Sequence, residues 1–296
     1  MGRSIKRALL YIIARLAAFF FFLLPVRLAV FLGGQAGILL FYVLAKHRKQ
    51  AIENLRIAFG REKTEAQIFD TAKRVFENLG KNAAEFASFS KINKNSIDGF
   101  IRVSGFKKID QALKDQKGAV VISCHMGNWE LSAAYFGLKG YPSNMIVRPL
   151  RDKRFDRLVN RMRSSKGLNA IPRDSSFKKI IAVLKSNGLV GILPDQDIGS
   201  IDGVFVKFFG KDAYTPKGPV LLAMASSAPL LAMFCIREKN RHHLIIEGPI
   251  DMQITGDREK DVLVNTQRWT DVVEKYIRRY PEQWVWMHKR WKTQPK

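Results

Sequence analysis

The first fifty residues are dominated by two apolar runs. Residues 8–24 are nearly all apolar, with only Arg15 interrupting, and a second run covers residues 28–45. Spanning a bilayer takes about 20 apolar residues, so each run is marginal alone. Basic residues flank the region on both sides, which favours both of its ends facing the cytoplasm: Arg3, Lys6 and Arg7 before it, and Lys46, His47, Arg48 and Lys49 after it. We therefore expect residues 1–49 to form a helical membrane-attachment region, as a re-entrant or interfacial pair rather than one clean span.

Two other interpretations of this region fit less well. A secretory signal also has a basic start and an apolar middle, but no convincing small-residue cleavage site precedes the second run. Core helices of a soluble domain would show a polar face, whereas Phe19–Phe22 are consecutive and no such face is visible. Membrane attachment remains the preferred interpretation.

The pattern after residue 50 is helical and then alternates. Apolar residues recur at three- and four-residue spacing from 50 to 90, and the break between Gly60 and Thr64 predicts one helix ending and a capped one starting. Candidate strands then fall at 119–124, 143–147, 189–193, 230–236 and 244–247, with helices at 131–138, 155–166, 177–186, 218–225 and 262–279. This alternation predicts an α/β domain over 50–296, with a central, mainly parallel or mixed sheet flanked by helices.

The chain is strongly basic. It carries 50 Lys and Arg against 26 Asp and Glu, a formal net charge of +24. Such a charge attracts polyanions, including nucleic acid, anionic membranes, phosphorylated lipids and acidic carrier proteins. The densest basic stretch, 148–163, is interrupted by Asp152 and Asp156, which is typical of a basic surface on a folded domain rather than a nucleic-acid-binding tail. The two cysteines lie in apolar runs and do not indicate a disulfide framework.

A histidine and a carboxylate follow the apolar strand 119–122. His125 and Glu130 lie where this strand gives way to a helix, and open α/β sheets place their chemistry at such strand ends. A continuous helix would put the two side chains about 140° apart, so the pair requires a turn, which Gly127 and Asn128 permit. We predict that His125 is a general base and that Glu130 orients its ring. The alternative is a structural histidine at a strand end.

Other catalytic chemistries lack their signatures. Cys124 adjoins His125, but adjacent residues leaving a strand point to opposite faces, so Cys124 is better explained as a small buried hydrophobic residue. The sequence has no G-x-S-x-G elbow, P-loop or G-x-G-x-x-G motif, and no HExxH or paired-cysteine motif. We therefore expect direct transfer without a covalent intermediate, with no metal and no cofactor.

Two further groups of polar residues follow strands. Asp195 belongs to a Pro-Asp-Gln-Asp run at the end of strand 189–193, which would bring it to the crevice that His125 occupies; its alternative is a glycine-rich turn with solvated aspartates. Arg148 directly ends strand 143–147 and leads toward Arg163, and guanidinium groups there suit phosphate or a developing oxyanion. We predict that Arg148, Arg163 and Asp195 line the substrate site.

Taken together, these motifs resemble the lipid A biosynthesis acyltransferases, a branch of the glycerolipid-type acyltransferases with an HX4D/E signature. The resemblance covers nearly the whole chain: the apolar start, Asn54-Leu55-Arg56 with Ala58-Phe59, His125 to Glu130, Arg148-Pro149, Arg163-Ser164, Pro194 to Asp197, Thr215 to Gly218, and the tail from Tyr280 through Trp284 and Trp286 to Lys292. The chain departs from better-known members at Met126-Gly127-Asn128-Trp129, where they carry more aliphatic residues.

The resemblance implies a specific activity. It implies a membrane-bound O-acyltransferase on the cytoplasmic face of the inner membrane, which moves a fatty acyl chain from acyl carrier protein, or less often coenzyme A, to a hydroxyl of a phosphorylated glycolipid, a lipid A precursor. It matches His125 and Glu130 to the catalytic pair, Arg163 and Asp195 to positions needed for activity, and Arg148 to a motif arginine. Related branches acylate phosphatidylinositol mannosides or lysophospholipids, so the acceptor stays open.

Two alternatives come from other functional classes. A basic, membrane-attached nucleic-acid-binding protein would explain the charge, but it predicts nothing for His125 or Glu130 and no nucleic-acid-binding module is visible, so we expect no nucleic-acid partner. A lipid-binding scaffold with an inactive site is disfavoured by the intact pair.

Overall fold

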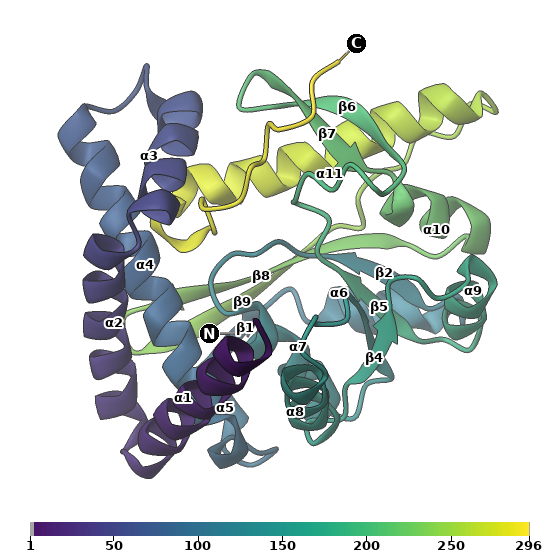
Figure 1. Ribbon diagram of the computed structural model, residues 1–296. Helices are drawn as coiled ribbons and strands as arrows, with labels where there is room; N and C mark the ends of the chain where they lie inside the picture. Colours follow the sequence, from purple (N-terminus) through teal and green to yellow (C-terminus); the bar gives the residue numbers. More distant parts are fainter. Residues whose placement is uncertain (1–2, 296) are drawn as a thin grey trace.

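The computed structural model describes residues 3–295, with the side chains of residues 3–7 and 10 excepted. The basic flank at Arg3, Lys6 and Arg7 therefore lies outside the described side chains. The protein has the predicted α/β fold, with a seven-stranded mixed sheet covered by helices and with two apolar helices at its N-terminus (Figure 1).

The elements follow one another with short connections. The helices are α1 (Arg3–Leu23), α2 (Val26–Val43), α3 (Ala45–Phe59), α4 (Glu65–Ala87), α5 (Ile97–Phe100), α6 (Lys107–Lys114), α7 (Trp129–Leu138), α8 (Lys153–Ser164), α9 (Phe177–Lys185), α10 (Gly218–Ser226) and α11 (Arg258–Arg279), with short 3-10 helices at η1 (Phe89–Lys91) and η2 (Pro281–Gln283). The strands are β1 (Ile101–Ser104), β2 (Ala119–Ile122), β3 (Ser143–Val147), β4 (Asn169–Pro172), β5 (Leu189–Ile192), β6 (Gly203–Phe208), β7 (Lys211–Pro216), β8 (Leu230–Glu238) and β9 (Arg241–Glu247).

The main sheet has the strand order β1-β9-β8-β2-β5-β3-β4. Strands β8, β2, β5, β3 and β4 run parallel, while β9 pairs with β8 in the antiparallel sense and with β1 in the parallel sense. The carboxyl ends of the five parallel strands therefore lie along one edge of the sheet, where open α/β folds bind their ligands.

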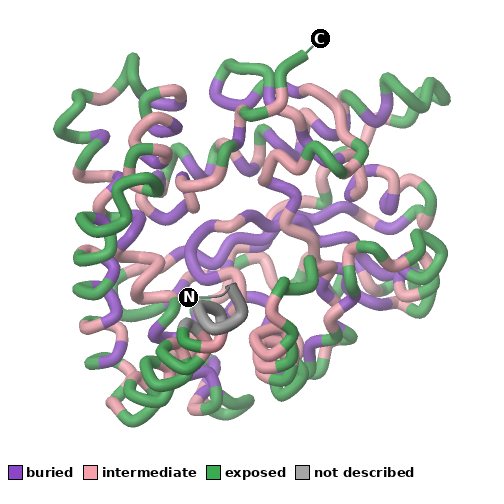
Figure 2. Tube along the Cα trace, in the orientation of Figure 1, coloured by how far each residue is buried: buried purple, intermediate pink, exposed green. Residues whose placement is uncertain are grey.

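Helices cover both faces of this sheet. One core packs α6 and α7 against it together with η1, and the other packs α9, α10 and α11 against the opposite face together with α3 and α4. Figure 2 shows the buried residues concentrated in the sheet and on the inward sides of these helices. The buried strand β2, with all four residues inaccessible, lies at the centre, as its continuous apolar sequence predicts.

The boundary at Gly60 and Thr64 is confirmed. Helix α3 ends at Phe59, and Thr64 caps α4 with a capping box in which its side chain accepts from the backbone N–H of Gln67. Helix α2 packs closely along α4 through glycines: a Cβ at Gly37 would lie 2.1 Å from the carbonyl oxygen of Phe76, and one at Gly80 would lie 2.0 Å from that of Gly33. Glycine is needed here because the two helix backbones approach each other closely.

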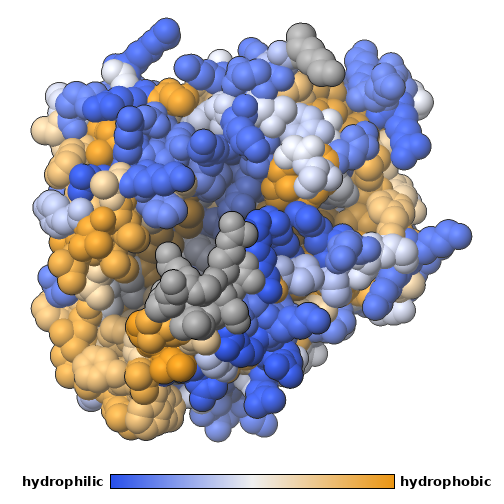
Figure 3. All heavy atoms as spheres, viewed as in Figure 1, coloured by the Kyte–Doolittle hydropathy of each residue, from blue (hydrophilic) through white to orange (hydrophobic). Residues whose placement is uncertain are grey.

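The N-terminal helices expose an apolar surface. Large apolar side chains lie open along α1 and α2, among them Leu16, Phe19, Phe31, Leu39 and Val43, each more than half exposed. Hydrophobic residues gather over α1 and α2 in Figure 3, whereas hydrophilic residues cover α8. By length and composition α2 could cross a membrane, and the apolar part of α1, Tyr11–Leu23, is shorter.

Several elements were not predicted from the sequence. Strands β1 and β4 are four residues long and carry little periodicity. The stretch after Asp197, for which a glycine-rich turn was the alternative, contains the two-stranded hairpin β6–β7, which packs on α11. Its strands are stabilised by a helix outside their own sequence, so local pattern alone gave no signal for them.

Candidate active site

The ends of neighbouring strands bring the candidate residues to one edge of the sheet. Strands β2 and β5 are parallel neighbours in which Ile122 pairs with Ile192. His125 and Asp195 each come three residues after this pair, so the register alone carries them to the same place. This confirms that the two strand ends converge on a single crevice.

His125 is bound to Asp195 at two points. The ring atom Nδ1 lies 2.8 Å from Asp195 Oδ1, and the backbone N–H of His125 donates to Asp195 Oδ2 at 2.9 Å. Because a carboxylate accepts, Nδ1 carries the proton and Nε2 keeps its lone pair. Within the described part of the chain Nε2 makes no hydrogen bond, and the His125 side chain is 26% exposed. The ring is thus fixed by one nitrogen and accessible at the other.

The electrostatics of the pair favour a base of increased strength. Burial lowers the pKa of His125, but the charge and hydrogen bond of Asp195, with a smaller contribution from the charge of Glu130, outweigh it and raise the pKa above its ordinary value. For Asp195 the directions are reversed: burial raises its pKa, but the charge and hydrogen bonds of His125 outweigh burial and bring the pKa well below the usual range. Asp195 is therefore an ionised, buried carboxylate that stabilises an imidazolium.

Glu130 has a different partner from the one that the sequence predicts. Its carboxylate accepts two hydrogen bonds from Arg163, from Nε at 3.0 Å and from Nη2 at 2.5 Å. The carboxylate that hydrogen-bonds to the ring of His125 is Asp195, which corrects the assignment of Glu130 as its orienter. The reason is geometric: Glu130 lies in the first turn of α7, where it meets Arg163 in the last turn of α8. Glu130 still lines the same cavity as His125.

A cavity of about 460 Å³ opens at this edge. His125, Glu130, Arg148 and Arg163 contribute to its wall, while Asp195 lies behind His125 with 2% of its surface exposed. The rest of the lining is mostly apolar, from Met145, Ile146, Val147, Leu150, Val159, Phe177, Ile180, Ile192, Leu193, Ile198, Ile201, Leu221 and Leu222. An apolar cavity of this size with a few convergent polar groups is typical of a small-ligand site.

Arg173 is a wall residue that the sequence did not reveal. It directly follows β4, as Arg148 follows β3, and Val147 pairs with Pro172 across these strands. One guanidinium nitrogen of Arg173, Nη1, is buried without a hydrogen-bond partner in the described structure. Recognising β4 would have been the signal, since Arg173 follows β4 just as Arg148 follows β3.

The C-terminal segment completes the site. The indole N–H of Trp284 donates to Asp195 Oδ2 at 2.8 Å, and the backbone N–H of Val285 donates to the carbonyl of His125 at 3.0 Å. Nearby, His288 stacks edge-on against Trp284, and burial lowers its pKa to about 4. This low pKa makes His288 a weak base, so it is less suited than His125 to take a proton near pH 7.

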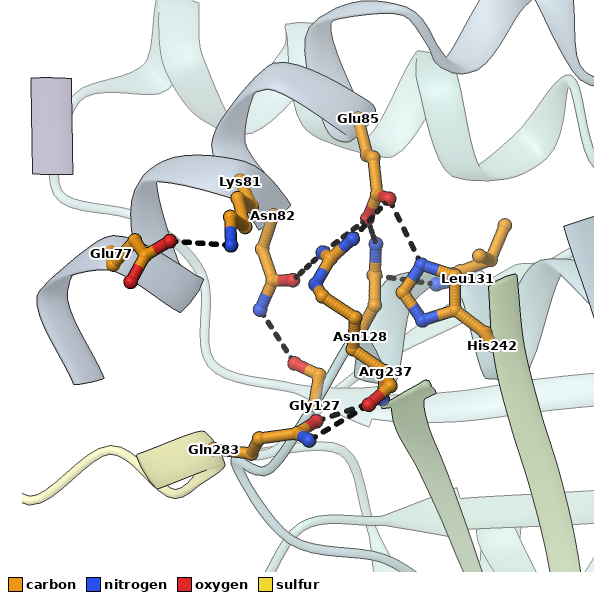
Figure 4. Close-up of polar contacts among 10 residues, drawn as sticks. All are labelled: Glu77, Lys81, Asn82, Glu85, Gly127, Asn128, Leu131, Arg237, His242 and Gln283. Atoms are coloured by element: carbon orange, nitrogen blue, oxygen red, sulfur yellow. Dashed lines mark hydrogen bonds and ion pairs between the residues drawn. The ribbon is translucent and has the colours of Figure 1, made fainter. Parts of the chain in front are cut away.

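A buried polar network supports the turn between His125 and Glu130 (Figure 4). The carboxylate of Glu85 on α4 is bound by both terminal nitrogens of Arg237, by His242 Nε2 and by the side-chain amide of Asn128. Asn128 in turn caps α7 by accepting from the N–H of Leu131. Gly127 permits the turn with a φ of 56°, and its carbonyl accepts from Asn82. His242 is thus part of a supporting network.

Cys124 takes no part in this chemistry. It is fully buried, and burial raises the pKa of its thiol well above the ordinary value. A protonated thiol inside the core is not a nucleophile.

The comparisons with known proteins extend the resemblance found in the motifs. Residues 3–293 match the model of the bacterial lipid A biosynthesis acyltransferases. This chain belongs to that family. It is 29% identical over 278 residues to the lipid A biosynthesis lauroyltransferase of Escherichia coli, covering 92% of this chain and 88% of that protein. Its identity to the palmitoleoyltransferase of the same organism is 26% over 277 residues, or 92% and 87% of the two chains.

One relative that matches a shorter part of the chain is named for a different acceptor. The phosphatidylinositol mannoside acyltransferase of Mycobacterium tuberculosis is 25% identical over 194 residues, which cover 64% of this chain and 59% of that protein. The relatives share acyl transfer, and this family member is accordingly an acyl-transferring enzyme.

Proposed function

We propose that this protein is a membrane-bound O-acyltransferase that moves a fatty acyl chain from an acyl thioester to a hydroxyl of a lipid A precursor. The observation that carries the proposal is the His125–Asp195 pair, whose histidine lines an apolar cavity. Family membership supplies the class of reaction, and the cavity supplies room for a hydrocarbon chain beside a base.

The reaction follows from the state of the His125 ring. Nε2 takes the proton of the acceptor hydroxyl as its oxygen attacks the thioester carbonyl, so the new ester C–O bond forms while the C–S bond breaks. The resulting imidazolium is stabilised by Asp195 and returns the proton to the departing thiolate. A general base of this kind contributes about 10²–10⁴-fold in rate.

The second carboxylate acts through charge. Glu130, held by Arg163, lies on the cavity wall and adds to the negative potential that raises the pKa of His125. Arg163 in turn limits this effect by compensating part of the charge, so the ion pair makes a small adjustment to the basicity of His125 and joins α7 to α8.

The arginines of the wall suit the charged parts of the reaction. Arg148 and Arg173 make no ion pair within the described structure, and both line the cavity. A guanidinium group there can bind an acceptor phosphate or the oxyanion of the tetrahedral intermediate. The remaining basic surface suits an acidic donor such as acyl carrier protein, with coenzyme A as the second donor class.

The apolar helices support attachment of the protein to a membrane. We propose attachment of α1 and α2 to the inner membrane with the catalytic domain on the cytoplasmic face, which is where a thioester donor is available. The exposed apolar side chains of both helices and the basic residues after α2 support this orientation.

The function is tested with the purified protein in detergent. Each donor class, acyl carrier protein or coenzyme A, is offered with a lipid A precursor, a phosphatidylinositol mannoside or a lysophospholipid, and products are measured by mass spectrometry. We expect the lipid A precursor to gain the mass of one acyl chain. Acylation of one of the other acceptors alone would change the assigned substrate, and no acyl transfer with any combination would refute the function.

A further inference from the structure

Two adjoining hollows lie between α1 and α8, away from the catalytic cavity. The first, about 210 Å³, is lined by Tyr11, Arg15, Arg154, Arg157, Leu158 and Arg161, and we call it the arginine hollow. The second, about 350 Å³, shares Arg15 and Leu158 with it. Its walls are largely apolar and include Phe19, Phe22, Phe89 and Met162, and we call it the apolar groove. A charged hollow thus opens into an apolar one.

The arginine hollow concentrates positive charge. Arg154 is paired with Asp152 at 2.6 Å. In the described structure Arg15 bonds only to the hydroxyl of Tyr11, and Arg157 only to the carbonyl of Lys153. Arg161 has no ion pair there. Like charges gathered in this way repel one another, and a bound anion offsets that repulsion. Guanidinium groups bind phosphate with two parallel hydrogen bonds.

The apolar groove gives the anion a hydrophobic extension. It lies beside the open apolar side of α1, where Leu16 and Phe19 are each at least 60% exposed. Figure 3 shows this contrast as hydrophobic residues over α1 next to hydrophilic residues over α8. A ligand that fills both hollows carries a phosphate and a hydrocarbon chain joined at short range.

We propose that this pair of hollows is a binding site for an anionic phospholipid of the membrane. Its phosphate lies among Arg15, Arg157 and Arg161, and one acyl chain lies along the apolar groove. The proposal is independent of the acyl-transfer reaction, because the lipid is bound and not consumed.

Helix α8 separates this lipid from the catalytic cavity. Val159 and Arg163 face the cavity that contains His125, whereas Leu158, Arg161 and Met162 line the two hollows. A lipid bound there is not aligned for reaction at His125. Its role is to hold α8, and with it one wall of the catalytic cavity, at the membrane surface.

The test uses the full-length protein in neutral detergent. Binding of phosphatidylglycerol, phosphatidylcholine and inorganic phosphate is measured by native mass spectrometry, for the wild type and for the triple variant Arg15→Gln, Arg157→Gln, Arg161→Gln. Each arginine near an anionic lipid contributes about fivefold in affinity, so we expect the triple variant to bind phosphatidylglycerol about 100-fold more weakly. Phosphatidylcholine should bind weakly to both proteins.

Two further variants locate the site. The triple variant Arg61→Gln, Arg241→Gln, Arg258→Gln removes the same charge from exposed positions elsewhere and should bind phosphatidylglycerol like the wild type. Ala18→Trp fills the apolar groove without changing a charge, and should weaken binding of phosphatidylglycerol but not of inorganic phosphate. All variants should keep turnover on a detergent-dispersed acceptor.

Four results would overturn the proposal. If the first triple variant binds phosphatidylglycerol as tightly as the wild type, the arginines do not form the site. If the control triple variant loses as much affinity, the effect is one of net charge alone. Inorganic phosphate binding as tightly as the phospholipid shows an anion site without a lipid. If the first triple variant loses turnover but still binds the phospholipid, the arginines bind a substrate of the reaction instead.

Discussion

Asp195 holds the ring of His125 by one oxygen and its backbone N–H by the other, although 70 residues separate the two in sequence. This double contact fixes the position of the imidazole as well as its tautomer. Replacing Asp195 with asparagine removes the charge and presents the ring with an amide, so the wrong tautomer is favoured. We expect Asp195→Asn to lower kcat by about 10²–10⁴-fold.

The same variant should change the pH profile. Because Asp195 raises the pKa of His125, its loss lowers that pKa, and the acid limb of kcat/KM should move to lower pH. Glu130→Gln is the matched control, since its charge makes the smaller contribution and should move the limb less. Circular dichroism checks the fold of both. A larger shift in Glu130→Gln than in Asp195→Asn would make Glu130 the dominant partner.

The ion pair between Glu130 and Arg163 should behave as a unit. Each side chain is only 15% exposed, so removing one partner leaves a poorly solvated charge behind. In urea unfolding, Glu130→Gln and Arg163→Gln should each destabilise the protein, and the double variant should lose less than their sum, with a coupling of about 0.5–3 kcal/mol. Additive losses would mean that the pair contributes no mutual stabilisation.

The Glu85 network should make stability depend on pH. Burial raises the pKa of Glu85, but His242 and Arg237 outweigh it and lower the pKa far below the ordinary value. A carboxylate with a lowered pKa contributes stability above its unfolded-state pKa, and that stability is lost as the pH falls below about 4. Glu85→Gln should cost about 3–5 kcal/mol at pH 7 and reduce this acid dependence.

Urea unfolding across pH tests the network. Glu53→Gln is the control, because Glu53 lies on the surface of α3 and forms only a long, exposed contact with Lys49. An equal pH dependence in Glu85→Gln and the wild type would place the acid sensitivity elsewhere.

The packing of α2 on α4 should tolerate alanine at one glycine and not at another. A methyl group at Gly37 meets the backbone of Phe76, which cannot move aside, so Gly37→Ala should destabilise the protein by about 1–3 kcal/mol or more. A methyl group at Gly34 meets only side-chain atoms, those of Lys81 and Glu77, which can shift, so Gly34→Ala should change stability by less than about 1 kcal/mol, since alanine favours helix. Thermal unfolding in detergent compares the two; equal effects would contradict this close approach.

Most of the fold could be predicted from the sequence because its long elements have a strong hydrophobic periodicity. The apolar runs, the capped start at Thr64 and the buried strand at 119–122 were all visible in the pattern. Strands β1 and β4 were not, because four residues at the side of a sheet leave little alternation to detect. The hairpin β6–β7 depends on α11, which is a tertiary contact.

The candidate site was only partly predictable for a related reason. Strand ends in register brought His125 and Asp195 together, and this followed from the two strand assignments. The hydrogen-bond partner of the His125 ring could not be predicted in this way, because the short sequence spacing favoured Glu130 over Asp195, which is 70 positions away. Nor could the sequence reveal the indole of Trp284 on Asp195, since that contact depends on the path of the C-terminal tail.

The turnover of His125→Gln tests the central claim most directly. Glutamine keeps a polar side chain in a partly exposed position but cannot act as a base near neutral pH, so the fold should survive while proton removal is lost. With purified protein in detergent, an acyl thioester donor and a lipid A precursor, we expect turnover to fall at least 100-fold while circular dichroism shows that the protein stays folded. Near-normal turnover in this variant would contradict the account.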